Sequence, residues 1–245
     1  GVRFAKEAGC SRVTLSREMT LPEIESCSHE GVELEVFAHG AICVCYSGLC
    51  LLSSMQRGKS ANRGLCRQPC RLPYRLVDEK GTQRDRMNGT RLMSPRDNCT
   101  IADIDALVEA GCASMKLEGR MKAPDYVGTV TKAYRAALDE WEQGEDPRVD
   151  ATVMRDLARA FNRNFTDGYL HGKHDNDFMS YERGNNRGQY AGSIIQAKGK
   201  KAIADLTEPV GVGDLLEIRN PDNFDDYVTA PCPRTTDGPT QLALD

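Results

Sequence analysis

A short internal repeat limits the folds open to this chain more than any other feature of its sequence. The tetrapeptide EAGC at residues 7–10 recurs at residues 109–112, and each copy precedes a short run of strand length. Glycine just past a helix supplies the left-handed backbone that ends it. Each copy therefore predicts a helix, a stop and a strand. A third unit starts at Thr20, which together with Glu23 has the spacing of a capping box.

Strands that alternate with helices predict an α/β fold with a parallel sheet. We expect strands at residues 12–16, 33–38, 90–93 and 114–117, and helices at residues 21–30, 101–108, 125–141 and 150–161. Four strands make half of a (β/α)8 barrel. An open doubly wound sheet has the same alternation, but no Gly-x-Gly-x-x-Gly turn follows a strand here, and that turn marks dinucleotide-binding sheets. We expect the C-terminal half of a TIM-like barrel.

The character of the sequence divides the chain into three parts. Its 245 residues, 40% of them apolar, suffice for one good-sized core and a small second one. Residues 1–145 carry the partial barrel, with a cysteine-rich loop at residues 43–75, and residues 146–188 form a helical connector and linker. From residue 189 short strands separated by turns predict a small β-barrel-like domain that spans residues 189–245.

Charge and hydropathy exclude two classes of protein. The formal net charge is -4 and the isoelectric point is about 5.7, which argues against a uniformly basic coat for nucleic acid but leaves room for a local basic patch. Residues 36–56 carry no Asp, Glu, Lys or Arg, but glycine, serine and cysteine interrupt them. We therefore expect no membrane span.

Half of the ten cysteines fall within the segment 43–75, which we call the cysteine loop. Disulfide frameworks belong mainly to small secreted domains without a large core, so we favour a metal site. Four thiolates suit an iron–sulfur cluster of the [4Fe-4S] kind or Zn²⁺. The expected ligands are Cys43, Cys50, Cys66 and Cys70, with Cys45 and Cys99 as alternatives to Cys70 for the fourth ligand. Cys66 and Cys70 have the spacing of a zinc knuckle, whereas Cys43 and Cys50 are too far apart for one, which favours iron–sulfur over zinc.

The cysteine loop is also strongly basic. No Asp or Glu occurs between residues 43 and 77. The basic residues of this stretch are Arg57, Lys59, Arg63, Arg67, Arg71 and Arg75. Such a patch suits the phosphates of RNA or another anionic substrate, and it would offset the charge of a tetrathiolate site. The alternative is a solvated loop face.

Chemistry in barrels and open sheets gathers at the carboxyl ends of the strands. The charged and titratable residues at these ends are Arg17, Glu18, His39, Arg96, Asp97, Glu118 and Arg120. In a barrel they would surround the same opening that the cysteine loop covers. We take Arg17, Glu18, His39, Glu118 and Arg120 as the candidate catalytic residues. Ordinary ion pairing between loops is the competing interpretation.

Two segments of the chain closely resemble the signature of the collagenase-like peptidase family U32. They are EVFAHGAIC at residues 35–43 and YSGLCLLS at residues 46–53. The segments LSRE at 15–18, KLEGRMK at 116–122 and NRNFTDGY at 162–169 are similar to the same family. The resemblance covers most of residues 12–192 and implies a (β/α) barrel whose early strands precede this signature, so that the chain lacks the N-terminal half.

The resemblance implies two different activities, proteolysis and hydroxylation. The family is named for collagen-degrading peptidases, but several members resemble oxygen-independent hydroxylation proteins that act on tRNA or rRNA pyrimidines or on a quinone precursor. Those members have a four-cysteine iron–sulfur site, whose ligands would be Cys43, Cys50, Cys66 and Cys70 here. The resemblance also implies prephenate as a source of the hydroxyl group, and Arg17 or Arg120 would bind its carboxylates.

A peptidase needs an activated nucleophile or a metal-bound water, and no such arrangement stands out in this sequence. We therefore expect a cytoplasmic, iron–sulfur-dependent enzyme that hydroxylates a pyrimidine of tRNA or 23S rRNA at its 5-position. Its basic loop would bind the RNA. Proteolysis of the U32 type is the alternative, and a zinc-stapled RNA-binding module without catalysis is a further one.

Overall fold

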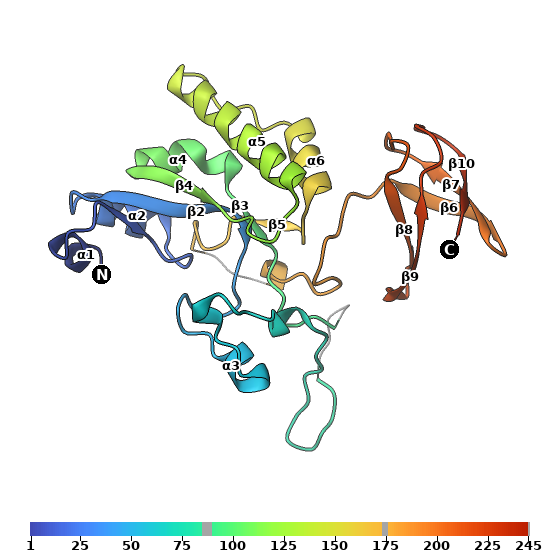
Figure 1. Cartoon of the computed structure of the whole chain (residues 1–245), viewed down its shortest axis with the longest axis horizontal. Coiled ribbons are helices and arrows are strands. Elements are labelled where there is room, and N and C mark those ends of the chain that lie inside the picture. Colours follow the sequence, from blue (N-terminus) through green and yellow to red (C-terminus); the bar gives the residue numbers. More distant parts are fainter. Residues whose placement is uncertain (85–89, 173–175, 245) are drawn as a thin grey trace. The chain divides into compact units, whose positions relative to one another are not determined.

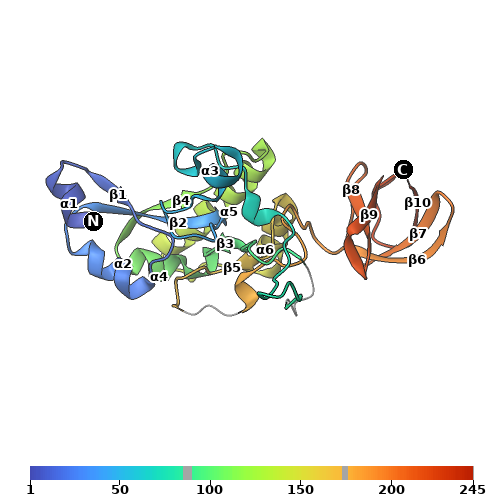
Figure 2. The same cartoon turned by 90° about the horizontal axis from the view of Figure 1, so that it is seen from below.

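The computed structural model describes residues 1–84, 90–172 and 176–244 (Figures 1 and 2). The chain forms two compact units, Gly1–Gly188 and Gln189–Asp245. Residues 146–188, expected from the sequence as a connector and linker, lie within the first unit. The helix of this segment packs on the preceding helix, and its short strand joins the sheet of that unit.

The first unit contains the predicted alternation of helices and strands. Its strands are β1 (Arg12–Thr14), β2 (Glu33–Ala41), β3 (Asp97–Cys99), β4 (Cys112–Leu117) and β5 (Phe165–Thr166). Its α-helices are α1 (Val2–Glu7), α2 (Leu21–Ser28), α3 (Leu52–Arg57), α4 (Ile104–Glu109), α5 (Pro124–Glu142) and α6 (Ala151–Ala160). Gly9 and Gly111 both have a φ of 87°, so the left-handed stop of each repeat is confirmed. The capping box of Thr20 and Glu23 is also present at the start of α2.

Strand β2 is the centre of the sheet (Figure 1). Strands β1 and β4 both run parallel to it, in register with Leu34 opposite Val13 and with Val36 opposite Met115. The strand predicted at residues 90–93 is wrong, since the strand lies at 97–99 and runs antiparallel to the end of β2. An antiparallel neighbour needs no crossover helix. The segment between β2 and β3 therefore leaves the sheet and returns to it at the same end of β2. Closure of these strands with others into a barrel stays a prediction.

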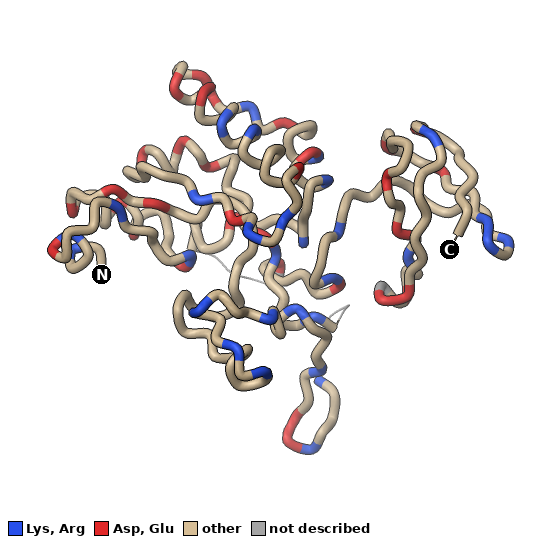
Figure 3. Tube along the Cα trace, in the orientation of Figure 1, with Lys and Arg blue, Asp and Glu red and all other residues tan. Residues whose placement is uncertain are grey.

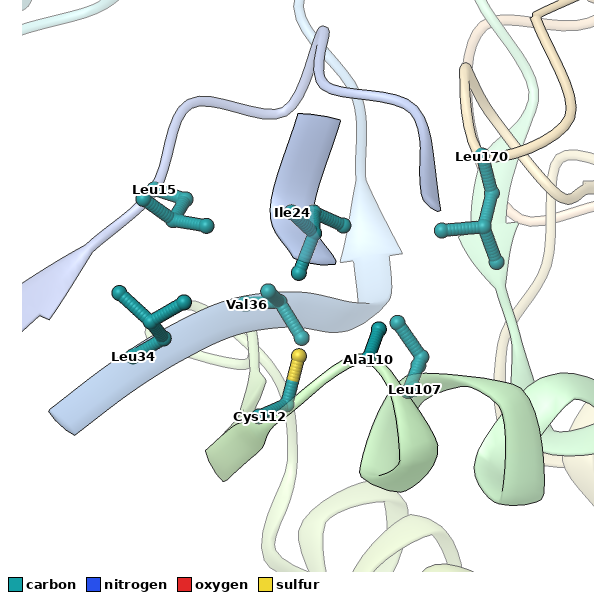
Figure 4. Packing of buried hydrophobic residues seen from close by; sticks show 8 residues of the cluster. All are labelled: Leu15, Ile24, Leu34, Val36, Leu107, Ala110, Cys112 and Leu170. Carbon is teal, nitrogen blue, oxygen red and sulfur yellow. The ribbon is translucent and has the colours of Figure 1, made fainter. Parts of the chain in front are cut away.

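Helices α2, α4, α5 and α6 pack against the sheet and form its core. Leu34 and Val36 of β2 point toward Ile24 of α2 and Leu107 of α4 (Figure 4). Further along the same face, Ala38 packs with residues of α5, α6 and the turn before α4. Alternate residues of a strand face opposite sides, so Glu35 and Phe37 lie on the other face. The sheet is thus apolar beneath its helices and free to be polar on the opposite face.

The second unit is built from antiparallel strands. One sheet has the strand order β10 (Thr240–Ala243), β7 (Lys201–Leu206) and β6 (Gly192–Lys198). A second sheet is the hairpin of β8 (Leu215–Asn220) and β9 (Asn223–Pro231). The core residues are Ala204, Leu206, Val210, Ala230, Cys232 and Leu242. Acidic residues outnumber basic ones in this unit. Among the described residues of the whole chain, no helix is long and apolar enough to cross a membrane.

Candidate functional site

The sheet face opposite the helices carries a carboxylate at its centre. Thr14 Oγ1 donates to Glu35 at 2.8 Å and Ser114 Oγ donates at 3.1 Å, from the strands on either side of β2. Lys116 Nζ lies 3.5 Å from the same carboxylate. The hydrogen bond from Thr14 is the largest cause that lowers the pKa of Glu35. Sequence reasoning missed Glu35, although a Glu between two core residues of a strand must face away from the core.

Arg17 and Glu118 meet at the carboxyl ends of β1 and β4, as the sequence predicts for strand-end residues. The guanidinium carbon of Arg17 lies 3.7 Å from the centre of the Phe37 ring, and its Nη2 lies 3.6 Å from Glu118 Oε2. Strand β2 passes close to this pair only because residue 40 is glycine. Its φ is 113°, and a Cβ atom there would lie 2.6 Å from the carbonyl oxygen of Glu118.

Glu18 and Arg120 bind the backbone of the cysteine loop. Glu18 Oε1 accepts hydrogen bonds from the backbone N–H of Ser47 at 2.8 Å and from its hydroxyl at 3.1 Å. Arg120 Nη2 donates to the carbonyl oxygen of Gly64 at 3.3 Å. Both residues were expected as catalytic candidates, and the structure gives them contacts that anchor the loop over the strand ends.

His39 does not lie at the opening, which corrects the expectation that it is a catalytic residue. Its side chain is 2% exposed and lies among the rings of Tyr126, Tyr134 and Phe165. Burial lowers the pKa of His39 to about 4, so the ring is neutral at pH 7. The cause is an irregularity in register between Phe37 and His39, where β2 has one more residue than β4. Such a bulge breaks the alternation of faces along β2, so a residue at the strand end need not face the opening.

The structure brings four cysteines of the loop together. Cys70 interacts electrostatically with Cys43, Cys50 and Cys66, and Cys43 interacts with Cys50 and Cys66. Burial is the main cause that raises the pKa of both Cys43 and Cys70. Cys99 lies elsewhere, in β3 beside Tyr134, and burial raises its pKa to about 11. Of the alternatives for the fourth ligand, the structure groups Cys70 with the other three.

The donor set was compared with the two metal groups that the sequence suggests. Residues 1–84, 90–172 and 176–244 hold no group of three or more His, Cys, Asp or Glu residues arranged to hold a metal ion. A single Zn²⁺ needs its sulfur ligands about 2.3 Å from one point. An iron–sulfur cluster is a larger body, held in its [4Fe-4S] form by four cysteine thiolates. A donor set of four thiols is the kind that iron–sulfur clusters and structural zinc sites both use, and the choice of an iron–sulfur cluster stays a prediction.

Five of the six basic residues of the loop are exposed, namely Arg57, Lys59, Arg63, Arg67 and Arg75. Figure 3 shows the basic residues of the loop without an acidic one among them. Arg71 differs, since its guanidinium is enclosed and donates to the carbonyl oxygen of Ile42 at 2.8 Å and to Ser94 Oγ at 2.9 Å. Burial, followed by the nearby Arg163, lowers the pKa of Arg71 to about 10. Arg71 therefore does not present its guanidinium to solvent as the other five basic residues do.

A buried ion pair lies behind the cysteine loop. Asp97, expected at the opening, is 2% exposed and accepts from Arg163, with Nη2 at 2.8 Å and Nε at 3.0 Å. Lys122 lies nearby above the Phe161 ring, and its pKa falls to about 8 because of burial and the charge of Arg163. Sequence reasoning named neither Arg163 nor Lys122 as a site residue. The signal was present, because both lie in segments that resemble the family signature.

Comparison with known proteins gives a consistent family relationship. The sequence pattern of peptidase family U32 matches residues 1–180. The chain is 33% identical over 225 residues to the 23S rRNA 5-hydroxycytidine C2501 synthase of Escherichia coli, covering 88% of this chain and 34% of that protein. It is 29% identical over 270 residues to the tRNA hydroxylation protein P of the same organism, covering 90% of this chain and 59% of that protein.

A relative with a different name matches equally well. The chain is 33% identical over 228 residues to a collagenase of Porphyromonas gingivalis, covering 85% of this chain and 55% of that protein. The chain thus spans between 34% and 59% of the length of these three relatives. No solved structure matches the chain. The family pattern extends over well more than half of the chain, and the chain therefore belongs to peptidase family U32.

Proposed function

We propose that this chain is part of an iron–sulfur enzyme that hydroxylates a pyrimidine base of tRNA or rRNA. The observation that carries the proposal is that four thiols of one exposed, basic loop lie near enough to interact electrostatically, in the segment that follows the carboxyl end of β2. Relatives named for tRNA and rRNA hydroxylation support the same class of substrate. The activity of the whole protein is proposed, since the chain spans only part of those relatives.

Cys43, Cys50, Cys66 and Cys70 would hold the cluster, which supplies one-electron chemistry when it is bound. The protein's own residues do the remaining work. Glu18 and Arg120 keep the loop over the strand ends through its backbone at Ser47 and Gly64. The backbone N–H of Gln68 also donates to Cys66 Sγ at 3.3 Å, and hydrogen bonds to sulfur tune such centres.

Arg17 supports a second element of the proposal, a small anionic co-substrate such as prephenate. Its Nε atom is buried and has no hydrogen-bond partner among the described residues. Its Nη2 faces Glu118 at 3.6 Å, a separation longer than a hydrogen bond. A carboxylate bound there would satisfy the buried N–H and form the paired contact that Arg makes with carboxylates.

The first experiment tests the cluster. The protein is reconstituted anaerobically with iron and sulfide, and its absorbance and its iron, sulfide and zinc contents are measured for wild type, Cys50→Ser and Cys10→Ser. We expect a broad iron–sulfur absorbance in wild type and in Cys10→Ser, since Cys10 is an exposed thiol outside the group. The absorbance should be lost in Cys50→Ser. Wild-type protein that holds zinc or no metal would contradict the proposal.

The second experiment tests RNA as the substrate. Binding of tRNA is measured against salt concentration for wild type, for the double variant of Arg63→Gln with Arg67→Gln, and for Lys132→Gln on α5. Each phosphate contact contributes about one to the salt slope, so we expect a loss of about two in the double variant. Lys132→Gln should bind like wild type. Mass spectrometry of the RNA from cells with wild type or Cys50→Ser then detects the added oxygen atom.

Proteolysis is the second candidate because a collagenase belongs to the relatives. The structure does not favour it, since the buried, neutral His39 cannot serve as an accessible base. Denatured collagen incubated with the same preparations decides between the two. Cleavage that persists in Cys50→Ser, together with unmodified RNA, would replace hydroxylation by proteolysis.

A further inference from the structure

The enclosed guanidinium of Arg71 joins two cysteines that lie far apart in the chain. Arg71 directly follows Cys70, and its Nη2 donates at 2.8 Å to the carbonyl oxygen of Ile42, the residue before Cys43. Cys43 and Cys70 are thus connected through one side chain and two adjoining peptide units. Cys70 also interacts electrostatically with Cys43.

The same guanidinium binds a third segment on its other side. Its Nη1 donates to Ser94 Oγ at 2.9 Å and to the carbonyl oxygen of Pro95. Ser94 is fully buried and lies just before β3, so this contact fixes the loop to the body of the unit. On the backbone side, a Cβ atom at Gly184 would lie 2.4 Å from the carbonyl oxygen of Arg71. Neighbouring residues therefore enclose both the side chain and the backbone of Arg71.

We propose that Arg71 is the positioning residue of the cysteine site, which sets the separation of Cys43 and Cys70 and supplies a fixed positive charge beside them. The inference rests on the proposed function, in which these two cysteines hold an iron–sulfur cluster. Arg suits the role because its planar fork reaches three acceptors at once, whereas Lys has one compact ammonium group. Arg71 acts through its neighbours and is no catalytic residue.

Two consequences of this role can be separated. Loss of the fork releases the loop, so the cluster should dissociate faster. Loss of the charge removes a cation that stabilises the reduced, more negative form of the cluster, so the midpoint potential should fall. Arg71→Met removes both contributions. Arg71→Lys keeps the charge and loses the three-acceptor fork.

The test compares Arg71→Met, Arg71→Lys and the matched control Arg75→Met, an exposed arginine of the same loop. The readouts are the rate of iron release to a chelator, the midpoint potential and amide hydrogen exchange of residues 42–75 in the metal-free protein. For Arg71→Met we expect about tenfold faster release, as for other residues that orient metal ligands, with a lower potential and faster exchange. Arg71→Lys should release iron faster at a potential near that of wild type, and Arg75→Met should match wild type.

The inference would be overturned if Arg71→Met released iron at the wild-type rate and had the wild-type midpoint potential. It would also be overturned if Arg75→Met changed both quantities as much as Arg71→Met. Circular dichroism checks that each variant is folded. Should Arg71→Met not fold, Arg71→Lys decides, because a folded variant that keeps iron as long as wild type also overturns it. A wild-type protein that binds no iron refutes the proposed function instead, while hydrogen exchange of the metal-free protein still tests the anchor.

Discussion

The cysteine loop and the helix-covered sheet of the same unit are held together by different interactions. The sheet buries Leu34, Val36 and Ala38 under its helices. The loop exposes its large apolar residues and uses polar contacts instead. Its exposed apolar side chains are Tyr46, Leu49, Leu51, Met55, Leu65 and Leu72. Hydrophobic burial therefore stabilises the sheet, while side-chain hydrogen bonds to backbone atoms position the loop.

This difference separates stability from ligand chemistry. Substitutions under the helices should unfold the unit and leave the intrinsic properties of the thiols unchanged. Substitutions at the loop anchors should loosen the cysteines at little cost in global stability. The following predictions test whether the sheet and the loop are stabilised independently, and each gives the result that would contradict this.

The largest effect is expected at the buried ion pair. Asp97→Asn leaves the Arg163 guanidinium buried without its carboxylate, and breaking a buried pair costs about 3 to 5 kcal/mol. Urea unfolding measures the change, with Asp177→Asn as the control because Asp177 pairs with Arg96 at the surface. Equal losses in the two variants would show that the Asp97–Arg163 pair does not stabilise the unit.

A core truncation should come next. Leu34→Ala removes a side chain that is 1% exposed, and such truncations cost about 3 kcal/mol in the free energy of unfolding. Hydrogen exchange of residues 42–75 should stay as in wild type at low denaturant. Faster exchange there, with the core still folded, would mean that packing under the helices also positions the loop.

His39 predicts a dependence on pH. Its pKa is about 4 in the folded protein and 6.5 in its ordinary state, so the unfolded chain takes up the proton first as the pH falls. Stability from this residue is complete above pH 6.5 and decreases toward pH 4, by about 2 kcal/mol at pH 5. His39→Phe should remove that part of the pH dependence. Parallel stability curves for wild type and variant would contradict the buried, neutral ring.

The smallest effect on stability is expected at a loop anchor. Glu18→Gln weakens the charged hydrogen bonds to Ser47, and we expect a loss of about 1 kcal/mol or less. Hydrogen exchange around residues 46–50 should nevertheless become faster. Glu25→Gln, on an exposed position of α2, is the control. Unchanged exchange in Glu18→Gln would show that this anchor does not position the loop.

Prediction from sequence succeeded where the signal is local. The glycine stops of the two EAGC repeats, the capping box at Thr20 and the strands near residues 12 and 33 depend on neighbouring residues, and the structure contains them. Prediction failed for the strand at residues 90–93, whose true position at 97–99 depends on pairing with β2. Pairing between distant strands is a tertiary contact, which propensity does not specify.

The candidate site divides in the same way. The sequence identified the four cysteines, since a local cluster of thiols and basic residues is visible without a fold. The choice of Cys70 over Cys99 needed the structure, because Cys99 lies in β3 beside Tyr134. Arg71 looked like its exposed neighbours in sequence, and only the acceptors at Ile42 and Ser94 distinguish it.

The sequence by itself determined the alternation of helices and strands, the division at residue 189 and the cluster of thiols, whose role as ligands stays a prediction. These follow from periodicity, turn residues and local clustering, which act over a few residues. The tertiary structure decided the direction of β3, the burial of His39 and the pairing of Asp97 with Arg163, which are 66 residues apart. One bulge in β2 was enough to move His39 into the core, because a shift of one residue in a strand changes the face of every side chain after it.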